Sequence, residues 1–122
     1  MAHGGFLRQH SDDPELASHV MHDYTNAELD PQTRGMLDYA SKLTRDPTSM
    51  QRSDVETLRT LRLSDEEILS VALITCQFNF MTRLADGLGV EVPPGRQEAH
   101  ERCLSPTAAQ QKMADGAERL AI

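Results

Sequence analysis

The sequence predicts an all-α protein, because helix signals are frequent along the chain and strand signals are missing. No stretch alternates apolar and polar residues over the length of a β-strand, and β-branched residues are few. An Asp-Pro pair stands at residues 13–14, 30–31 and 46–47, where helices can begin or end. The 122 residues correspond to about one domain, in which we expect four main helices.

The first two helices follow from their terminal signals. A helix over roughly 13–26 begins at the first Asp-Pro pair and carries apolar residues at intervals of four. The second begins at the next Asp-Pro pair and ends at Arg45, because the residue before Pro47 is kept out of the α region.

The third and fourth helices have recognisable start signals as well. The third is short and begins at Ser53-Asp54. The fourth begins after Ser64, whose hydroxyl forms a capping box with Glu67. It is the longest helix and runs to about Leu88, and Gly89 supplies the left-handed residue that ends it.

The fourth helix is apolar around most of its circumference. Three short amphipathic helices can cover such a helix only in part, so either chains pair through it or part of the domain is missing. The first alternative predicts a homo-oligomer, between a dimer and a hexamer, that forms through this helix. Its apolar residues are Ile68, Leu69, Val71, Leu73, Ile74, Phe78, Phe80 and Met81.

Membrane association is not expected. The most apolar stretch, residues 68–81, contains Ser70, Thr75, Gln77 and Asn79, so it is too short and too polar to span a bilayer. The N-terminus has no basic start followed by an apolar run, so no signal peptide is visible. The two cysteines are far apart in the sequence, which suits a reducing cytoplasm.

The charge distribution divides the chain into a domain, residues 1–94, and a C-terminal tail, residues 95–122. The net charge is −7, and all of the acidic excess lies before the Val-Pro-Pro-Gly sequence at 92–95. An acidic surface repels phosphate backbones, so we expect no nucleic-acid partner, and a helical DNA-binding regulator is disfavoured. The tail is predicted to hold at most one short helix, near 107–120.

Few side chains suggest chemistry on spacing alone. His19 and His22 are best explained as solvated surface residues, and no metal site is expected, because no Cys pair or His-Glu-x-x-His pattern joins them. Cys76 is expected to be a buried thiol of the core. Asn79, inside the apolar helix, either lines a site or hydrogen-bonds to another helix. Arg83 is expected to pair with Asp86.

Three segments carry a resemblance to a known family: LDYASKLTRDP at 37–47, LSDEEI at 63–68 and FNFMTRLADGLGV at 78–90. In order and spacing they resemble the peroxidase-related branch of the alkylhydroperoxidase D-like (AhpD-like), carboxymuconolactone decarboxylase superfamily, over roughly residues 2–94. Thr82 stands where the family often has Asn. The resemblance implies an all-helical, oligomeric fold and hydroperoxide reduction by a Cys-x-x-Cys-x-x-x-His motif. Asn79 and Arg83 are the candidate substrate-binding residues. The resemblance implies a small hydroperoxide as substrate, and no cofactor is expected.

The start of the sequence resembles the end of that redox motif. Ala2-His3-Gly4 matches its last residues, which implies that His3 is the motif's catalytic histidine. Both cysteines of the motif would precede Met1, so the sequence resembles the C-terminal half of the family domain. In the family, a thiolate attacks the peroxide and a second cysteine resolves the sulfenic acid as a disulfide. Cys76 and Cys103 do not have that spacing, so we expect no turnover by this chain.

Two functional hypotheses follow. The first is a peroxidase-related AhpD-like protein that is inactive as this chain stands. The alternative is a non-enzymatic helical protein that acts through homo-oligomerisation or interaction. An upstream Cys-x-x-Cys in the same reading frame would favour the first hypothesis over the second.

Overall fold

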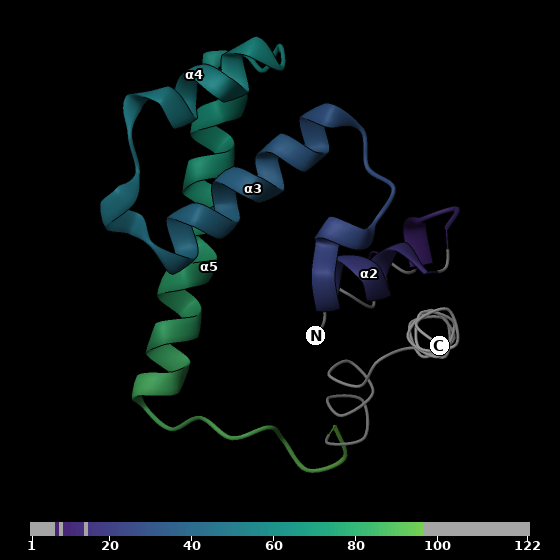
Figure 1. Ribbon diagram of the computed structural model, residues 1–122. Helices are drawn as coiled ribbons and strands as arrows, with labels where there is room; N and C mark the ends of the chain where they lie inside the picture. The colour runs from purple at the N-terminus through teal and green to yellow at the C-terminus, as the bar shows by residue number, and fades with distance from the viewer. Residues whose placement is uncertain (1–6, 8, 14, 97–122) are drawn as a thin grey trace, which may run out of the picture. The chain divides into compact units, whose positions relative to one another are not determined.

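The computed structural model describes residues 7, 9–13 and 15–96, and within these residues it contains helices and no strand (Figure 1). The all-α prediction is therefore confirmed. The elements in chain order are α2 (Leu16–Asp23), the 3-10 helix η1 (Tyr24–Asn26), α3 (Pro31–Arg45), the 3-10 helix η2 (Pro47–Ser49), α4 (Arg52–Thr60) and α5 (Asp65–Gly87).

The chain divides into two compact units. Residues 29–90 form the unit that contains α3, α4 and α5, whereas α2 and η1 belong to the other unit. The predicted boundary between residues 94 and 95 stays a prediction, because residues 97–122 lie outside the described part of the chain. The short helix expected near 107–120 also falls there.

The α2 helix is shorter than predicted. It begins at Leu16, because the carboxylate of Asp13 instead accepts a hydrogen bond from the Glu15 N–H (2.8 Å) and holds a turn before the helix. It ends at Asp23, and the chain continues to Asn26 as the 3-10 helix η1.

The α3 helix has the predicted ends. The carboxylate of Asp30 accepts a hydrogen bond from the Thr33 N–H (3.0 Å), and Pro31 occupies the first helical position, where no N–H is needed. The helix closes when the Asp46 N–H donates to the carbonyl of Lys42 (2.8 Å).

The α4 helix begins at Arg52, slightly before the predicted start at Ser53-Asp54. Asp54 does not cap the helix from outside; its carboxylate reaches back to the N–H of Gln51 (2.7 Å). At the other end, the Leu63 N–H donates to the Leu58 carbonyl (3.2 Å), and this Schellman turn leaves Arg62 with φ of 67°.

The α5 helix has the predicted cap and the predicted stop. The Ser64 N–H donates to the Glu67 carboxylate (2.7 Å), and the Glu67 N–H donates back to the Ser64 hydroxyl (3.3 Å). At the C-terminus, Gly89 has φ of 64°, and the Val90 N–H donates to the carbonyl of Ala85 (2.9 Å). This end is a second Schellman turn, and here the left-handed residue is a glycine, which adopts a positive φ without steric cost.

The core of the 29–90 unit is small and lies where α3, α4 and the start of α5 meet. Leu58, Leu63 and Ile68 are buried there. Gly35 lets α3 approach α4, since a Cβ at this position would collide with the Leu61 side chain. Gln32 ties the two helices together by donating its amide to the carbonyl of Leu61 (2.8 Å).

Candidate functional site

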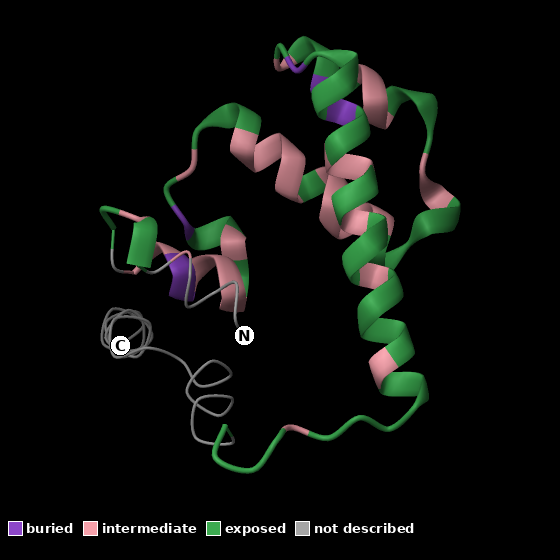
Figure 2. Ribbon diagram, turned by 180° about the vertical axis from the view of Figure 1, so that it is seen from behind, coloured by how far each residue is buried: buried purple, intermediate pink, exposed green. Residues whose placement is uncertain are grey.

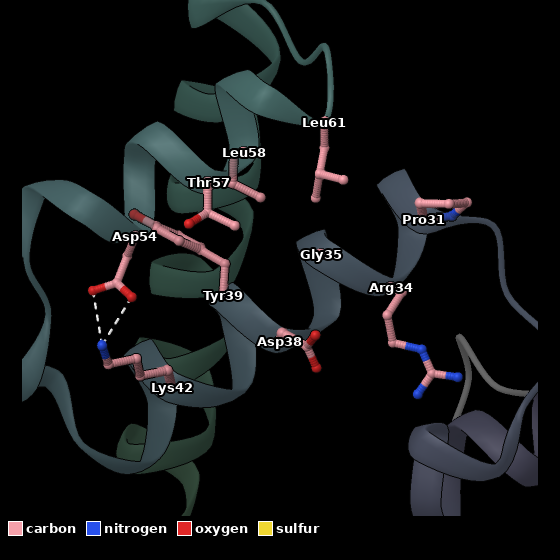
Figure 3. Close-up of a pocket in the computed structure, with 10 residues that line it drawn as sticks. All are labelled: Pro31, Arg34, Gly35, Asp38, Tyr39, Lys42, Asp54, Thr57, Leu58 and Leu61. Carbon is pink, nitrogen blue, oxygen red and sulfur yellow. Dashed lines mark hydrogen bonds and ion pairs between the residues drawn. The ribbon is translucent and has the colours of Figure 1, made fainter.

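An open pocket of about 360 Å³ lies between α3 and α4 (Figure 3). Leu58 and Leu61 form apolar walls, and the remaining lining residues are Pro31, Arg34, Gly35, Asp38, Tyr39, Lys42, Asp54 and Thr57. The pocket was not predicted, because its walls come from segments whose sequence spacing gives no signal. Its lining holds no cysteine and no histidine, so it does not supply the groups that thiol chemistry requires.

Lys42 and Asp54 form an ion pair at the rim of this pocket. The ammonium nitrogen lies 2.8 Å from both carboxylate oxygens, and the two side chains point at each other in Figure 3. The hydrogen bond from Lys42, and then that from the Gln51 N–H, lowers the pKa of Asp54. Each charge therefore already has its partner, and the pair joins α3 to α4.

Asn79 and Arg83 lie one turn apart on α5, away from the pocket. The amide of Asn79 donates to the hydroxyl of Thr44 on α3 (3.0 Å), so of the two predicted roles the structure shows the helix-to-helix hydrogen bond. Arg83 lies with a guanidinium nitrogen 3.5 Å from the Asn79 carbonyl. The expected Arg83–Asp86 pair is wrong, since none of the ion pairs among the described residues joins them.

Cys76 is exposed, and the prediction of a buried thiol is wrong for the single chain. The apolar surroundings in the sequence suggested burial, but α3 and α4 cover only one side of α5. His3 and Cys103 lie outside the described residues, so their placement stays a prediction.

The histidines of α2 are half-buried, not solvated as predicted. His19 and His22 both have intermediate exposure, and the Nε2 atom of His19 is buried with no hydrogen-bond partner. Within the described ranges, no three His, Cys, Asp or Glu side chains gather as a metal site would require.

A large part of α5 is exposed, and Figure 2 shows the helix exposed along most of its length. Leu73 and Phe80 are each 60% exposed, although such residues are usually buried. The exposed large apolar residues of α5 are Leu69, Leu73, Ile74, Phe78, Phe80, Met81 and Leu84. Exposed apolar surfaces of this kind are typical of places where a protein contacts another protein, a ligand or a membrane.

By length and composition, α5 could also cross a membrane. It has 23 residues and a mean hydropathy of 1.4 over its most apolar window, so the whole helix is longer than the stretch 68–81 that was judged too short to span a bilayer. The expectation of no membrane association stays a prediction. Core helices of soluble proteins meet the same criteria. The finding therefore does not by itself distinguish a bilayer from a protein partner.

The fold has counterparts among solved structures. An uncharacterized peroxidase-related protein from Silicibacter sp. TM1040 is 35% identical with a TM-score of 0.70, and the match covers 76% of this chain and 49% of that protein. A second, described as an alkylhydroperoxidase AhpD core and uncharacterized peroxidase-related protein from Ralstonia eutropha JMP134, is 32% identical with a TM-score of 0.67 and the same coverage. No protein-family model and no curated protein matches.

The chain shares its all-α fold and 32–35% of its aligned residues with peroxidase-related, AhpD-like structures, in agreement with the three sequence segments. It spans about half the length of the solved structures that it matches.

Cys76 on α5 lacks the partners that the family's redox motif would place after it. Counting from Cys76, the second cysteine and the histidine of Cys-x-x-Cys-x-x-x-His would fall at positions 79 and 83. Asn79 and Arg83 stand there instead, and Asn79 is engaged with α3. The described part of the chain therefore offers Cys76 no resolving thiol at the family spacing.

Proposed function

We propose that this chain is a peroxidase-related AhpD-like protein. It forms helices of the scaffold of an AhpD-like domain and does not itself reduce hydroperoxides. Cysteine placement carries the proposal: the 122 residues contain cysteines at 76 and 103 alone, and no Cys-x-x-Cys. A thiol peroxidase of this family needs one thiolate to attack the peroxide and a second to resolve the sulfenic acid. The resemblance of the sequence to the C-terminal half of the family domain supports the same assignment.

Peroxide consumption with a dithiol reductant tests this proposal. We expect the 122-residue chain to consume cumene hydroperoxide no faster than a variant carrying Cys76→Ser and Cys103→Ser. A single oxidised thiol without a resolving partner cannot cycle by the family mechanism. Robust turnover that either single substitution abolishes would contradict the proposal and indicate a rearranged active site.

An upstream segment provides the complementary experiment. If the genome encodes a Cys-x-x-Cys in frame before Met1, joining that segment to the chain should produce turnover. His3 would then stand four residues after the second cysteine and relay the proton. Turnover of the joined protein that His3→Ala leaves unchanged would remove His3 from the mechanism.

The exposed face of α5 favours a second candidate function, homo-oligomerisation without catalysis. Exposure of these apolar side chains to water is unfavourable in free energy, and pairing of chains would remove them from solvent. Light scattering at micromolar concentration tests this candidate, and a stable monomer would contradict it.

A further inference from the structure

The exposed residues of α5 follow a heptad pattern. Spacings of three and four residues connect seven positions, all exposed in the single chain, which we call the α5 seam. These are Glu66, Leu69, Leu73, Cys76, Phe80, Arg83 and Gly87. Alternating spacings of this kind place side chains in one stripe, the arrangement by which two helices pack knobs into holes. The seam lies on a different side of α5 from Ile68, which faces the core.

We infer that two copies of this chain pair through the α5 seam with their helices antiparallel. This inference rests on the second candidate function, assembly, and specifies its geometry. Charge selects the direction: Glu66 stands at one end of the seam and Arg83 at the other, with apolar residues between them. A parallel pair would place each of these charges beside its own copy, which costs free energy.

The antiparallel pair has one register that satisfies every seam position from 66 to 83. Reversing one helix brings each a position opposite a d position of the other. The layers, from the end to the middle, are Glu66 with the partner's Arg83, Leu69 with the partner's Phe80, and Leu73 with the partner's Cys76. The two-fold axis of the dimer generates the same three layers a second time. From Glu66 to Arg83 the seam is about 26 Å long, at a rise of 1.5 Å per residue.

The neighbouring registers are worse. Sliding one helix by seven residues places Arg83 against the partner's Leu73 and leaves Glu66 with no opposite charge. A guanidinium buried against leucine without a partner is unfavourable. Neither Glu66 nor Arg83 takes part in an ion pair within the described residues, so both charges are available to the second copy.

The other exposed row of α5 lacks this complementarity. Ile74, Phe78 and Met81 lie on a different face, and the row continues to Ala85 with no basic residue at its end. Charge therefore directs self-pairing to the seam and not to this second row.

A charge-swap series tests the pairing in the full 122-residue chain by sedimentation velocity over a range of concentrations. Arg83→Glu and Glu66→Arg each place like charges together twice per dimer, so each should raise the dissociation constant about tenfold or more. The double variant restores opposite charges and should return to within about threefold of the unmodified chain. A double variant as weak as the single variants would overturn the inference.

Two adjacent residues provide a matched control for the apolar layers. Phe80 and Met81 are 60% and 50% exposed in the single chain, so Glu is tolerated by the monomer at either position. Phe80→Glu should abolish pairing through the seam, whereas Met81→Glu should leave it intact. Circular dichroism confirms that both variants remain helical. Loss of pairing in Met81→Glu alone would place the interface on the other row and overturn the inference.

Cys76 provides an independent readout, in a Cys103→Ser chain. Opposite the partner's Leu73 its thiol is covered, so its reaction with a disulfide reagent should slow as protein concentration rises. A rate independent of concentration would contradict the register. A monomer in every experiment would overturn both this inference and the assembly candidate, whereas an oligomer insensitive to seam variants would overturn the inference alone.

A bilayer is the competing occupant of the same face. Phosphatidylcholine–phosphatidylglycerol vesicles are the probe, and the inference expects no co-sedimentation of the chain with them. Vesicle binding that Phe80→Glu abolishes, by a chain that stays monomeric without lipid, would assign the seam to a membrane and overturn the inference.

Discussion

Arg62 and Gly89 occupy the same left-handed backbone position at the C-terminal ends of α4 and α5, a position that suits glycine but not arginine. Each has a positive φ, 67° and 64°, as the left-handed residue of a Schellman turn. A residue with a Cβ pays a steric penalty in this region, and glycine does not. The C-terminus of α4 therefore stores strain that the C-terminus of α5 avoids.

Exchanging the two residue types should change stability in opposite directions. Arg62→Gly should raise the free energy of unfolding by about 0.5–1 kcal/mol, because the steric cost is lost. Gly89→Ala should lower it by about 1 kcal/mol through backbone strain alone, since a Cβ there meets no atom within 4 Å. Urea unfolding of both variants provides the comparison, and destabilisation by Arg62→Gly would show that the arginine side chain stabilises the turn.

The sequence leaves one residue role open between two alternatives. Asn79 either lines a site or forms an inter-helix hydrogen bond, and its bond to Thr44 supports the second. The Lys42–Asp54 pair could not have been predicted, because its members are 12 residues apart on different helices. Such a pair depends on how α3 and α4 pack, and no local pattern records that packing.

At the scale of elements, helix boundaries with strong local signals were predictable. Asp30-Pro31 and the Ser64–Glu67 box fix the starts of α3 and α5, because a side chain there satisfies a backbone N–H that the helix leaves open. The start of α4 was displaced because Gln51, which precedes the helix, is not a preferred cap. The exposure of Cys76 was missed because periodicity shows that a face is apolar but not what covers it.

The carboxylates at these helix starts make stability depend on pH. The hydroxyl and then the backbone N–H of Thr33 hold the pKa of Asp30 below the usual range, and the backbone N–H and then the hydroxyl of Ser64 do so for Glu67. The hydrogen bond from Lys42 lowers the pKa of Asp54 in the same way. A carboxyl with a lowered folded-state pKa stabilises the fold above its unfolded-state pKa and loses that contribution as the pH falls through the folded-state value.

We therefore expect the melting temperature to fall as the pH drops below about 4, and to change little in this respect between about pH 5 and 7. Asp30→Asn keeps a side-chain oxygen that accepts from the Thr33 N–H and should flatten part of that acid dependence. Thermal melts across this range provide the test. An acid profile unchanged in Asp30→Asn would remove this carboxylate from the pH dependence.

At the scale of the whole molecule, the C-terminal tail is the segment most open to test. The sequence from residue 95 onward has balanced charge and few large apolar residues, which are Leu104, Met113, Leu120 and Ile122. Deleting residues 95–122 should therefore leave the melting temperature within a few degrees, because little apolar area is lost. A much larger fall, measured by calorimetry at the same protein concentration, would make the tail part of the core.

Asp54 has a consequence for the way in which the 29–90 unit opens. Its carboxylate receives the Gln51 N–H at the start of α4 and the ammonium group of Lys42 from α3. When the first turn of α4 frays, Lys42 of α3 therefore loses its carboxylate partner. When α3 separates from α4, the Asp54 carboxylate loses the ammonium group that helps to hold it at the first turn of α4. In hydrogen–deuterium exchange, the Gln51 amide consequently reports on the docking of two helices and not on one helix end, which makes α3 and the start of α4 one cooperative opening unit.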